Sequence, residues 1–266
     1  MPNSLSLRVW GEFALFTRPE LKVERLSYPV MTPSAARGVF DAILFKPQMA
    51  WHVRRITVIE PNFPADFPDV SRRMPYRLVG VRRNEIIGKL APRTVEGWMK
   101  EPSTFEPYLV DSAGRDGAQG QNRTQRNSLV LQHVAYVIEA TPVLTARANQ
   151  PRRVAEDDED HGPDSVAKYV AMFQRRAQKG QYFHHPYLGC REFACHFALP
   201  DGSEKPLTDW SESLGLMLYD MKFDPTTKGN HLPGFFQAKI ERGVLHCDTQ
   251  ANGPNGEPPI QVIGWS

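Results

Sequence analysis

The stretch that decides the fold is TPSAARGVFDAILFKP, residues 32–47. Thr32 can cap a helix, and Pro33 suits the first helical position because the N–H that proline lacks would be unpaired there. A Lys-Pro pair ends the stretch. Apolar residues recur between these limits at spacings of three and four, which places them on one helix face: Ala36, Val39, Phe40 and Ile43. The sequence therefore predicts a helix over residues 33–44 with one face in the core.

Strands and a second helix are predicted on both sides of this helix. The second helix, at residues 165–179, has an apolar stripe and ends at Gly180. Alternating or continuous apolar patterns predict strands at Leu5 to Val9, 52–60, 133–140 and 191–199. The order strand, helix, strand, strand, helix, strand predicts an α+β fold of the ferredoxin-like (RRM-like) type, with two helices on one face of an antiparallel sheet.

Two further regions complete the predicted organisation. Residues 61–131 are rich in Pro, Gly, Arg and Asn, and they are interpreted as a basic insertion in the form of a long hairpin. Within them, residues 111–122 are expected to be a loop that cannot pack. Short strands near 214–221 and 235–241 suggest a small β-rich part. The predicted domains are therefore 1–200, a ferredoxin-like domain whose second sheet face is of a kind often used to bind RNA, and 201–266, β-rich.

Charge is distributed unevenly along the chain. The net charge is only +2, but residues 72–93 carry seven Lys and Arg against one acid, while five acids stand together at 156–160. This separation of sign is typical of a polyanion-binding face. A solvated charged surface is the alternative.

The sequence lacks the usual markers of several other classes. It has no GxxxxGK[ST], GxGxxG or GxSxG, no apolar run long enough for a membrane helix, and no signal-peptide pattern. The three cysteines form no CxxC pair, so a disulfide framework is not expected and a cytoplasmic location fits. No metal site and no cofactor are predicted.

Metal-free RNA cleavage needs residue types that this chain has near its second helix. RNA carries its own nucleophile, the 2′-hydroxyl, so a protein can cleave it by aligning that oxygen with the phosphate, deprotonating it and stabilising the added charge. Suitable Lys, Tyr, Arg and His residues stand at Lys168, Tyr169, Arg175, Arg176, Tyr182, His184 and His185. Lys168, Arg175 and Lys179 share one helix stripe, which favours a bound anion or a solvated face.

Several long segments resemble the Cas-five family of CRISPR systems, subtype I-C (Dvulg-like). They occur in the family's order and cover most of residues 5–240. YPVMTPSAARG (28–38) and LGCREF (188–193) are the most specific. The others are the remainder of 8–47, VRRNEI (81–86), NRTQRNSL (122–129), VAYVIEA (134–140), the remainder of 168–193, and LGLMLYD (214–220).

The resemblance implies a subunit that binds the CRISPR repeat RNA, cleaves the precursor transcript without metal, and stays on the 5′ handle of the guide RNA. Its partners would be the backbone and large subunits of the interference complex. A non-catalytic structural subunit is the alternative, and contact with duplex DNA near the PAM could accompany either. The RNA-binding residues expected on this basis are Lys22, Arg25, Arg37, Lys46, Arg82, Arg83, Arg123, Arg126, Arg175, Arg176 and Arg191.

The catalytic residues that the resemblance implies are matched in part. The family's processing residues are a Tyr near the end of the first helix and a Lys-His pair at the start of the second. Lys168 matches the lysine, while Tyr169 stands in place of the histidine and Leu44 in place of the tyrosine. The expected catalytic residues are therefore Lys168 and Tyr169. Tyr169 could instead be a core aromatic residue, and Tyr28, Tyr182, His184 or His185 could act as substitutes.

Overall fold

The structure is a computed structural model that describes residues 4–21, 23–60, 75–86, 92–105, 123–149, 164–223, 231–250 and 257–265. Lys22, the predicted loop 111–122 and the acidic run 156–160 lie outside the described residues. The backbones of Arg83 and Arg123 are described, but their side chains are not.

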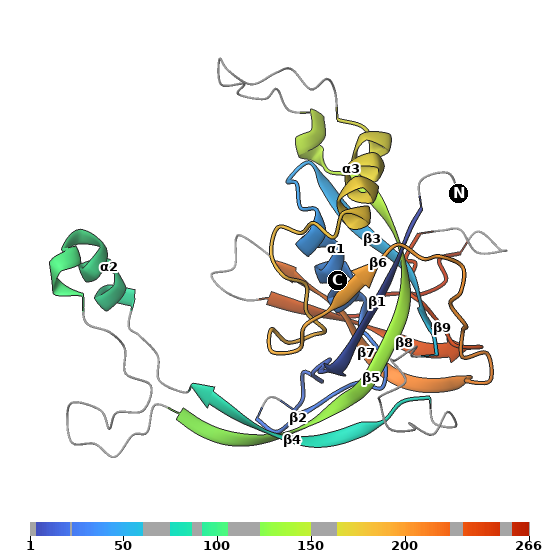
Figure 1. Ribbon diagram of the computed structural model, residues 1–266, viewed down its shortest axis with the longest axis horizontal. Coiled ribbons are helices and arrows are strands. Elements are labelled where there is room, and N and C mark those ends of the chain that lie inside the picture. Colours follow the sequence, from blue (N-terminus) through green and yellow to red (C-terminus); the bar gives the residue numbers. More distant parts are fainter. Residues whose placement is uncertain are drawn as a thin grey trace.

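The chain folds into strands and a smaller number of helices (Figure 1). The helices are α1 (Pro33–Ile43), α2 (Pro92–Lys100), α3 (Val166–Gln178) and the 3-10 turns η1 (Pro102–Thr104) and η2 (Ala146–Asn149). The strands are β1 (Leu5–Ala14), β2 (Arg25–Leu26), β3 (Met49–Val58), β4 (Leu78–Ile86), β5 (Arg123–Leu144), β6 (His196–Ala198), β7 (Glu212–Phe223), β8 (His231–Glu241) and β9 (Val244–His246). The α+β class is confirmed, and both predicted helices occur within about one residue of their expected limits.

One strongly curved sheet joins all the described strands. Its order is β6-β1-β5-β3-β9-β8-β7, with β2 and β4 pairing to β5 off this path. All pairs are antiparallel except the short β2–β5 pair. The curvature is plain in Figure 1, where β5 sweeps along the whole length of the sheet.

Strand β5 is much longer than the strand predicted at 133–140. It begins at Arg123 and stays continuous to Leu144, because it exchanges partners along its length: β4 and β2 pair with its first part, β1 and β3 with its second. We call β4 together with residues 123–131 of β5 the arm. Figure 1 shows the arm extending from the body, with α2 drawn away from it.

Two other predicted strands differ from the structure. The strand expected at 52–60 begins earlier, at Met49, because Met49 and Trp51 continue the buried alternation. The strand expected at 191–199 is regular only over β6. Its first residues close a tight turn instead, in which Leu188 N–H donates to Phe193 O and Phe193 N–H donates to Cys190 O.

Helices α1 and α3 cover the same part of the core. Phe40 of α1 stacks on Phe173 of α3 with ring centroids 4.7 Å apart, and Trp51 of β3 meets Phe173 edge-on at 4.9 Å. The indole N–H of Trp51 also donates to the carbonyl of Leu44, which follows α1, at 2.9 Å. This aromatic cluster fixes the end of α1 against α3 and the sheet.

The C-terminal strands continue the main sheet. Strand β9 pairs with β3, and β8 and β7 follow in order. Arg37 of α1 binds Asp220 of β7 through two hydrogen bonds of 2.8 and 3.0 Å. The sequence pattern predicted short C-terminal strands but could not reveal that they pair onto the main sheet, because the topology of the fold decides which strands are neighbours. Among the described residues, no helix is long and apolar enough to cross a membrane.

Candidate nucleic-acid interface

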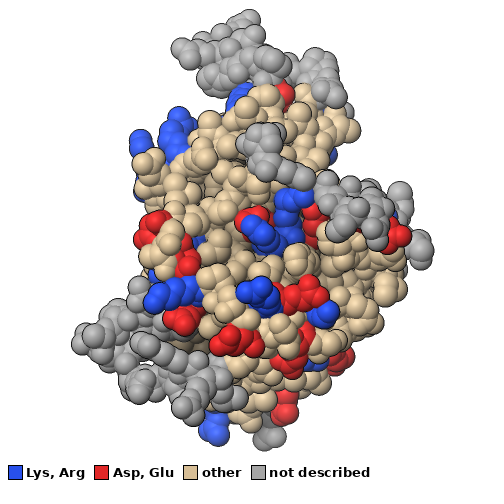
Figure 2. Space-filling model, turned by 90° about the vertical axis from the view of Figure 1, so that its right-hand side faces the viewer, with Lys and Arg blue, Asp and Glu red and all other residues tan. Residues whose placement is uncertain are grey.

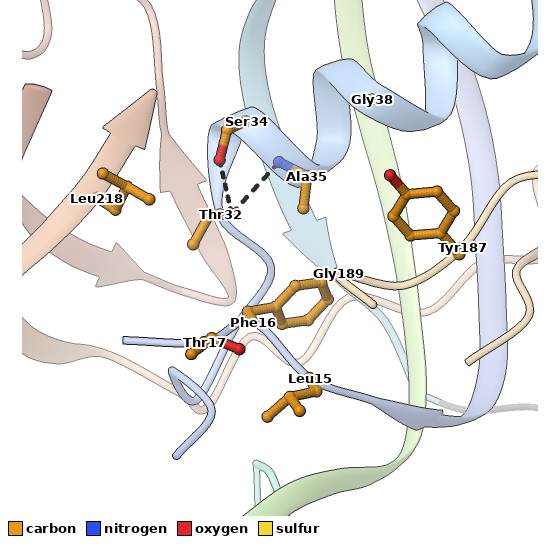
Figure 3. Close-up of a pocket in the computed structure, with 10 residues that line it drawn as sticks. All are labelled: Leu15, Phe16, Thr17, Thr32, Ser34, Ala35, Gly38, Tyr187, Gly189 and Leu218. Atoms are coloured by element: carbon orange, nitrogen blue, oxygen red, sulfur yellow. Dashed lines mark hydrogen bonds between the residues drawn. The ribbon is translucent and has the colours of Figure 1, made fainter. Parts of the chain in front are cut away.

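A pocket of about 280 Å³ lies against the first turns of α1 (Figure 3). It is close to the lower size limit of small-molecule pockets. Its lining comes from the residues after β1, from α1 and its N-cap, from the loop after α3 and from β7: Leu15, Phe16, Thr17, Thr32, Ser34, Ala35, Gly38, Tyr187, Gly189 and Leu218. The two sequence segments that most resemble the Cas-five family, 28–38 and 188–193, therefore meet at one pocket.

Local backbone chemistry explains why these segments meet. Thr32 caps α1, since its Oγ1 accepts from the Ala35 N–H at 3.3 Å, as the dashed lines in Figure 3 show. Gly189 adopts φ +81°, and an added Cβ would lie 2.1 Å from the carbonyl oxygen of Leu15. Only glycine allows this approach. Leu15 N–H then donates to the Leu188 carbonyl at 3.0 Å, which joins the loop to the end of β1.

Three of the predicted RNA-binding arginines lie around this pocket. Arg191 is exposed, two residues beyond Gly189. Arg25 is half-buried, and its Nη1 donates to Cys190 Sγ at 3.8 Å. Arg37 binds Asp220 and also Asp41, at 2.9 Å, so its guanidinium ties α1 to β7. Burial would lower the pKa of Arg37, but the hydrogen bonds and charges of these carboxylates outweigh it and raise that pKa.

The loop after α3 runs from this pocket to the far end of α1. Figure 1 shows it passing α1 before it reaches β6. Phe183 N–H donates to the Ala42 carbonyl at 2.7 Å, and His184 N–H is 3.4 Å from the same oxygen. Arg176 Nη1 donates to the Ile43 carbonyl at 2.8 Å. These donors satisfy carbonyls that a helix end leaves without intrahelical partners. We call this surface the α1 track: the pocket, the loop 180–191, and Phe45 with Lys46.

The catalytic candidates lie at the opposite end of α3 from Arg176. Lys168 is eight residues earlier, about 12 Å along the helix axis. Asp164 joins the two candidates, because its Oδ1 accepts from the Tyr169 hydroxyl at 2.6 Å and lies 3.4 Å from Lys168 Nζ. The Asp164 side chain is 2% exposed and that of Lys168 is 24% exposed. Tyr169 is buried, as its place on the apolar stripe suggested.

The other candidates differ in how accessible they are. Leu44 is fully buried. Tyr28 is also buried; burial raises its pKa, and its hydroxyl oxygen accepts from Leu218 N–H at 3.2 Å. Tyr182, His184 and His185 are exposed on the α1 track. Among the residues that the structure describes, no group of three or more His, Cys, Asp or Glu could hold a metal ion.

Two of the predicted cations of the arm have described side chains. Arg82 of β4 is exposed and Arg126 of β5 is half-buried. In the antiparallel register, Arg82 is opposite Asn127 and Arg83 is opposite Arg126, so these four residues occupy adjacent positions on the two strands of the arm. The face in Figure 2 shows a different pattern, with Lys and Arg interspersed among Asp and Glu. That face is not uniformly basic.

Sequence reasoning missed Phe45 and Phe183, which are 59% and 81% exposed. It also did not foresee that the two family segments line one pocket. The sequence did contain a signal for this exposed aromatic surface, because residues 182–185 are a run of four aromatic residues that fits neither a helical nor a strand period. No acid occurs between residues 165 and 191.

The chain matches the family model described as CRISPR-associated protein (Cas_Cas5) over residues 4–248. It belongs to the Cas5d family of CRISPR-associated proteins. The resemblance noted in the sequence is thus confirmed.

Two Cas5d relatives resemble the chain over most of its length. The CRISPR pre-crRNA endoribonuclease Cas5d of Mannheimia succiniciproducens is 40% identical over 251 residues, covering 92% of this chain and 95% of the relative. The protein of the same description from Thermus thermophilus is 38% identical over 261 residues, covering 92% of each.

Solved structures share the fold at lower identity. One described as a CRISPR-associated protein has a TM-score of 0.55 and 20% identity, covering 92% of this chain and 91% of its own. The Streptococcus mutans protein SMU1763c, described as functionally uncharacterized, has a TM-score of 0.55 and 18% identity, covering 98% and 96%.

Proposed function

We propose that this Cas5d protein is an endoribonuclease that binds CRISPR repeat RNA, cleaves the pre-crRNA and stays on the 5′ handle of the guide RNA. The observation that carries the proposal is its 40% and 38% identity, over nearly full length, to two proteins described as pre-crRNA endoribonucleases. The α1 track and the arm supply cations for an RNA ligand. Phosphate contacts of this kind give most of the affinity for nucleic acid.

We propose a fold that supports this role, with a ferredoxin-like domain over residues 1–200 that carries the insertion 61–131, and a β-rich part over 201–266. The order β6-β1-β5-β3, with all neighbours antiparallel, supports the ferredoxin-like assignment. The partners we propose are the guide RNA and the backbone and large subunits of the interference complex, with duplex DNA as a further ligand. We propose action in the cytoplasm, a choice supported by Cys195 and Cys247, whose buried thiols form no disulfide.

Cleavage in this proposal needs no metal ion. The 2′-oxygen attacks the adjacent phosphorus and its proton passes to a base, while the P–O5′ bond breaks and the leaving 5′-oxygen takes up a proton from water. The products are a 2′,3′-cyclic phosphate and a 5′-hydroxyl. Lys168 is the cation that stabilises the negative charge added in the transition state. Tyr169 acts through Asp164, which it holds beside the Lys168 ammonium group.

The test is cleavage of repeat RNA in EDTA by the protein and by Lys168→Ala. We expect one cut in the wild type and a loss of about 100-fold or more in the variant, the scale of removing one charge-stabilising group. Tyr169→Phe should lower kcat with little change in KM. Lys239→Ala, an exposed lysine on β8, is the matched control.

The same experiment distinguishes the endoribonuclease from the competing function. Leu44 and Tyr169, in place of the family's Tyr and His, favour a non-catalytic subunit that only binds the 5′ handle. Intact RNA that binds tightly to the wild type would support that subunit. A cut that Lys168→Ala makes at the wild-type rate would remove Lys168 from the proposal.

A further inference from the structure

Four consecutive aromatic side chains lie exposed beside the end of α1. In the segment 182–185, Phe183 is 81% exposed and Tyr182 46% exposed, and both histidines are exposed. Phe45, which follows α1, is 59% exposed. Single exposed apolar residues are ordinary, but a run of this kind marks an interaction site more often than a solvated surface.

The segment is held in place although its rings face solvent. Its backbone approaches the Ala42 carbonyl through the N–H groups of Phe183 and His184. The Tyr182 ring meets the His185 ring at 5.1 Å and the Phe197 ring at 6.4 Å, both edge-on. A site that is already ordered loses less entropy when a ligand binds. Phe183 has a ring contact with His184 at 6.1 Å and projects its remaining surface outward.

Charge around the segment selects the class of ligand. Residues 165–191 and 42–59 contain no acid. Asp41, the acid that interacts with His184 of the segment, is paired with Arg37. Lys46, Arg175 and Lys179 are exposed at the ends of the two helices that border the segment. A basic surface with exposed aromatic rings suits single-stranded nucleic acid, because unpaired bases stack on the rings while cations follow the phosphates. Bases inside a duplex are already stacked and cannot use such rings.

We propose that residues 182–185 form a stacking platform for unpaired bases of the RNA, with Phe183 as the main stacking residue. The proposal rests on the proposed RNA-binding function and adds that the platform holds a single-stranded stretch. Phe45 and Lys46 extend the platform along the end of α1.

The test is a pair of binding titrations with wild type, Phe183→Ala and Phe183→Trp. One ligand is a labelled single-stranded repeat RNA, and the other is a fully paired RNA duplex of the same length. We expect Phe183→Ala to weaken single-strand binding by about fivefold or more, the effect of losing one stacked base, and to leave duplex binding unchanged. Phe183→Trp should bind as wild type, and its added tryptophan emission should be quenched by the single strand.

Matched controls separate the outcomes. Met99→Ala removes a side chain of similar exposure, 78%, on α2, and it should bind both ligands as wild type. Equal single-strand binding by Phe183→Ala and wild type would overturn the platform and leave the exposed ring for a protein partner. Equal weakening for both ligands would overturn it as well. A wild type that binds neither RNA would instead refute the proposed function.

Discussion

Asp248, two residues after β9, binds two side chains of β3. It is 5% exposed. His52 Nε2 lies 2.9 Å from its Oδ1, Arg54 Nη2 lies 2.6 Å from its Oδ2, and Gln250 N–H donates to Oδ1 at 2.9 Å. Burial raises the pKa of Asp248, but the hydrogen bonds from His52 and Gln250 and the charge of Arg54 outweigh it and hold that pKa below its ordinary value.

This carboxylate should make stability depend on pH. Because its folded pKa is below the unfolded value of about 3.9, its contribution is complete well above that value and is lost as pH falls through the folded pKa. We expect Asp248→Asn to lower the free energy of unfolding by about 3 kcal/mol at pH 7, since Arg54 loses a buried partner. Urea unfolding at pH 7, 5 and 3.5 measures this, and the difference from wild type should shrink at the lowest pH.

The control for this prediction is Asp209→Asn, because Asp209 is exposed. It should unfold within about 0.5 kcal/mol of wild type at every pH. A constant difference between Asp248→Asn and wild type from pH 7 to 3.5 would contradict the role given to the carboxylate.

At the scale of elements, the loop 187–191 depends on how closely its backbone packs on the end of β1. Gly189 and Gly202 both have positive φ, +81° and +86°, so alanine costs about 1 kcal/mol at either position. Only Gly189 would also place its Cβ against a backbone carbonyl, while nothing lies within 4 Å of the corresponding position at Gly202.

We therefore expect Gly189→Ala to be destabilised by about 3 kcal/mol, against about 1 kcal/mol for Gly202→Ala. Thermal unfolding of the two variants measures the difference. Gly189→Ala should also weaken RNA binding, since the clash with the Leu15 carbonyl would displace a loop that is part of the α1 track. Equal melting temperatures for the two variants would mean that the loop does not need its contact with Leu15.

On the scale of the whole molecule, the proposed RNA surface joins the arm to the α1 track. If about six phosphates are contacted, affinity should fall by roughly 10³-fold between 50 and 200 mM salt. Replacing Arg82, Arg83, Arg123 and Arg126 by Ala should weaken binding and reduce the slope of log Kd against log salt by about 3. Fluorescence anisotropy over a salt series measures both quantities.

A matched control removes four exposed cations outside the arm: Lys205, Lys222, Lys239 and Arg242. It changes the net charge of +2 by the same amount and should leave the slope nearly unchanged. An unchanged slope in the arm variant would count against the arm as an RNA-binding surface.

The sequence by itself determined the two helices, the α+β class and the family. These follow from residues close together in the chain: the cap at Thr32, the apolar spacing of α1 and α3, and the segments 28–38 and 188–193. Capping and helical periodicity act over a few residues, so they can be read without knowing the topology. The basic character of the arm could also be predicted, because charge follows directly from the amino-acid composition.

Only the tertiary structure decided which side chains are exposed and which already have hydrogen-bond or ion-pair partners. Arg37 meets Asp220 across 183 residues of chain, Tyr169 is buried with its hydroxyl on Asp164, and Phe183 stays exposed beside Ala42. Likewise, residues 28–38 and 188–193 line one pocket only because the sheet order brings the loop after α3 to the start of α1. Such contacts depend on strand pairing between distant segments, and that pairing leaves no periodic trace in the local sequence.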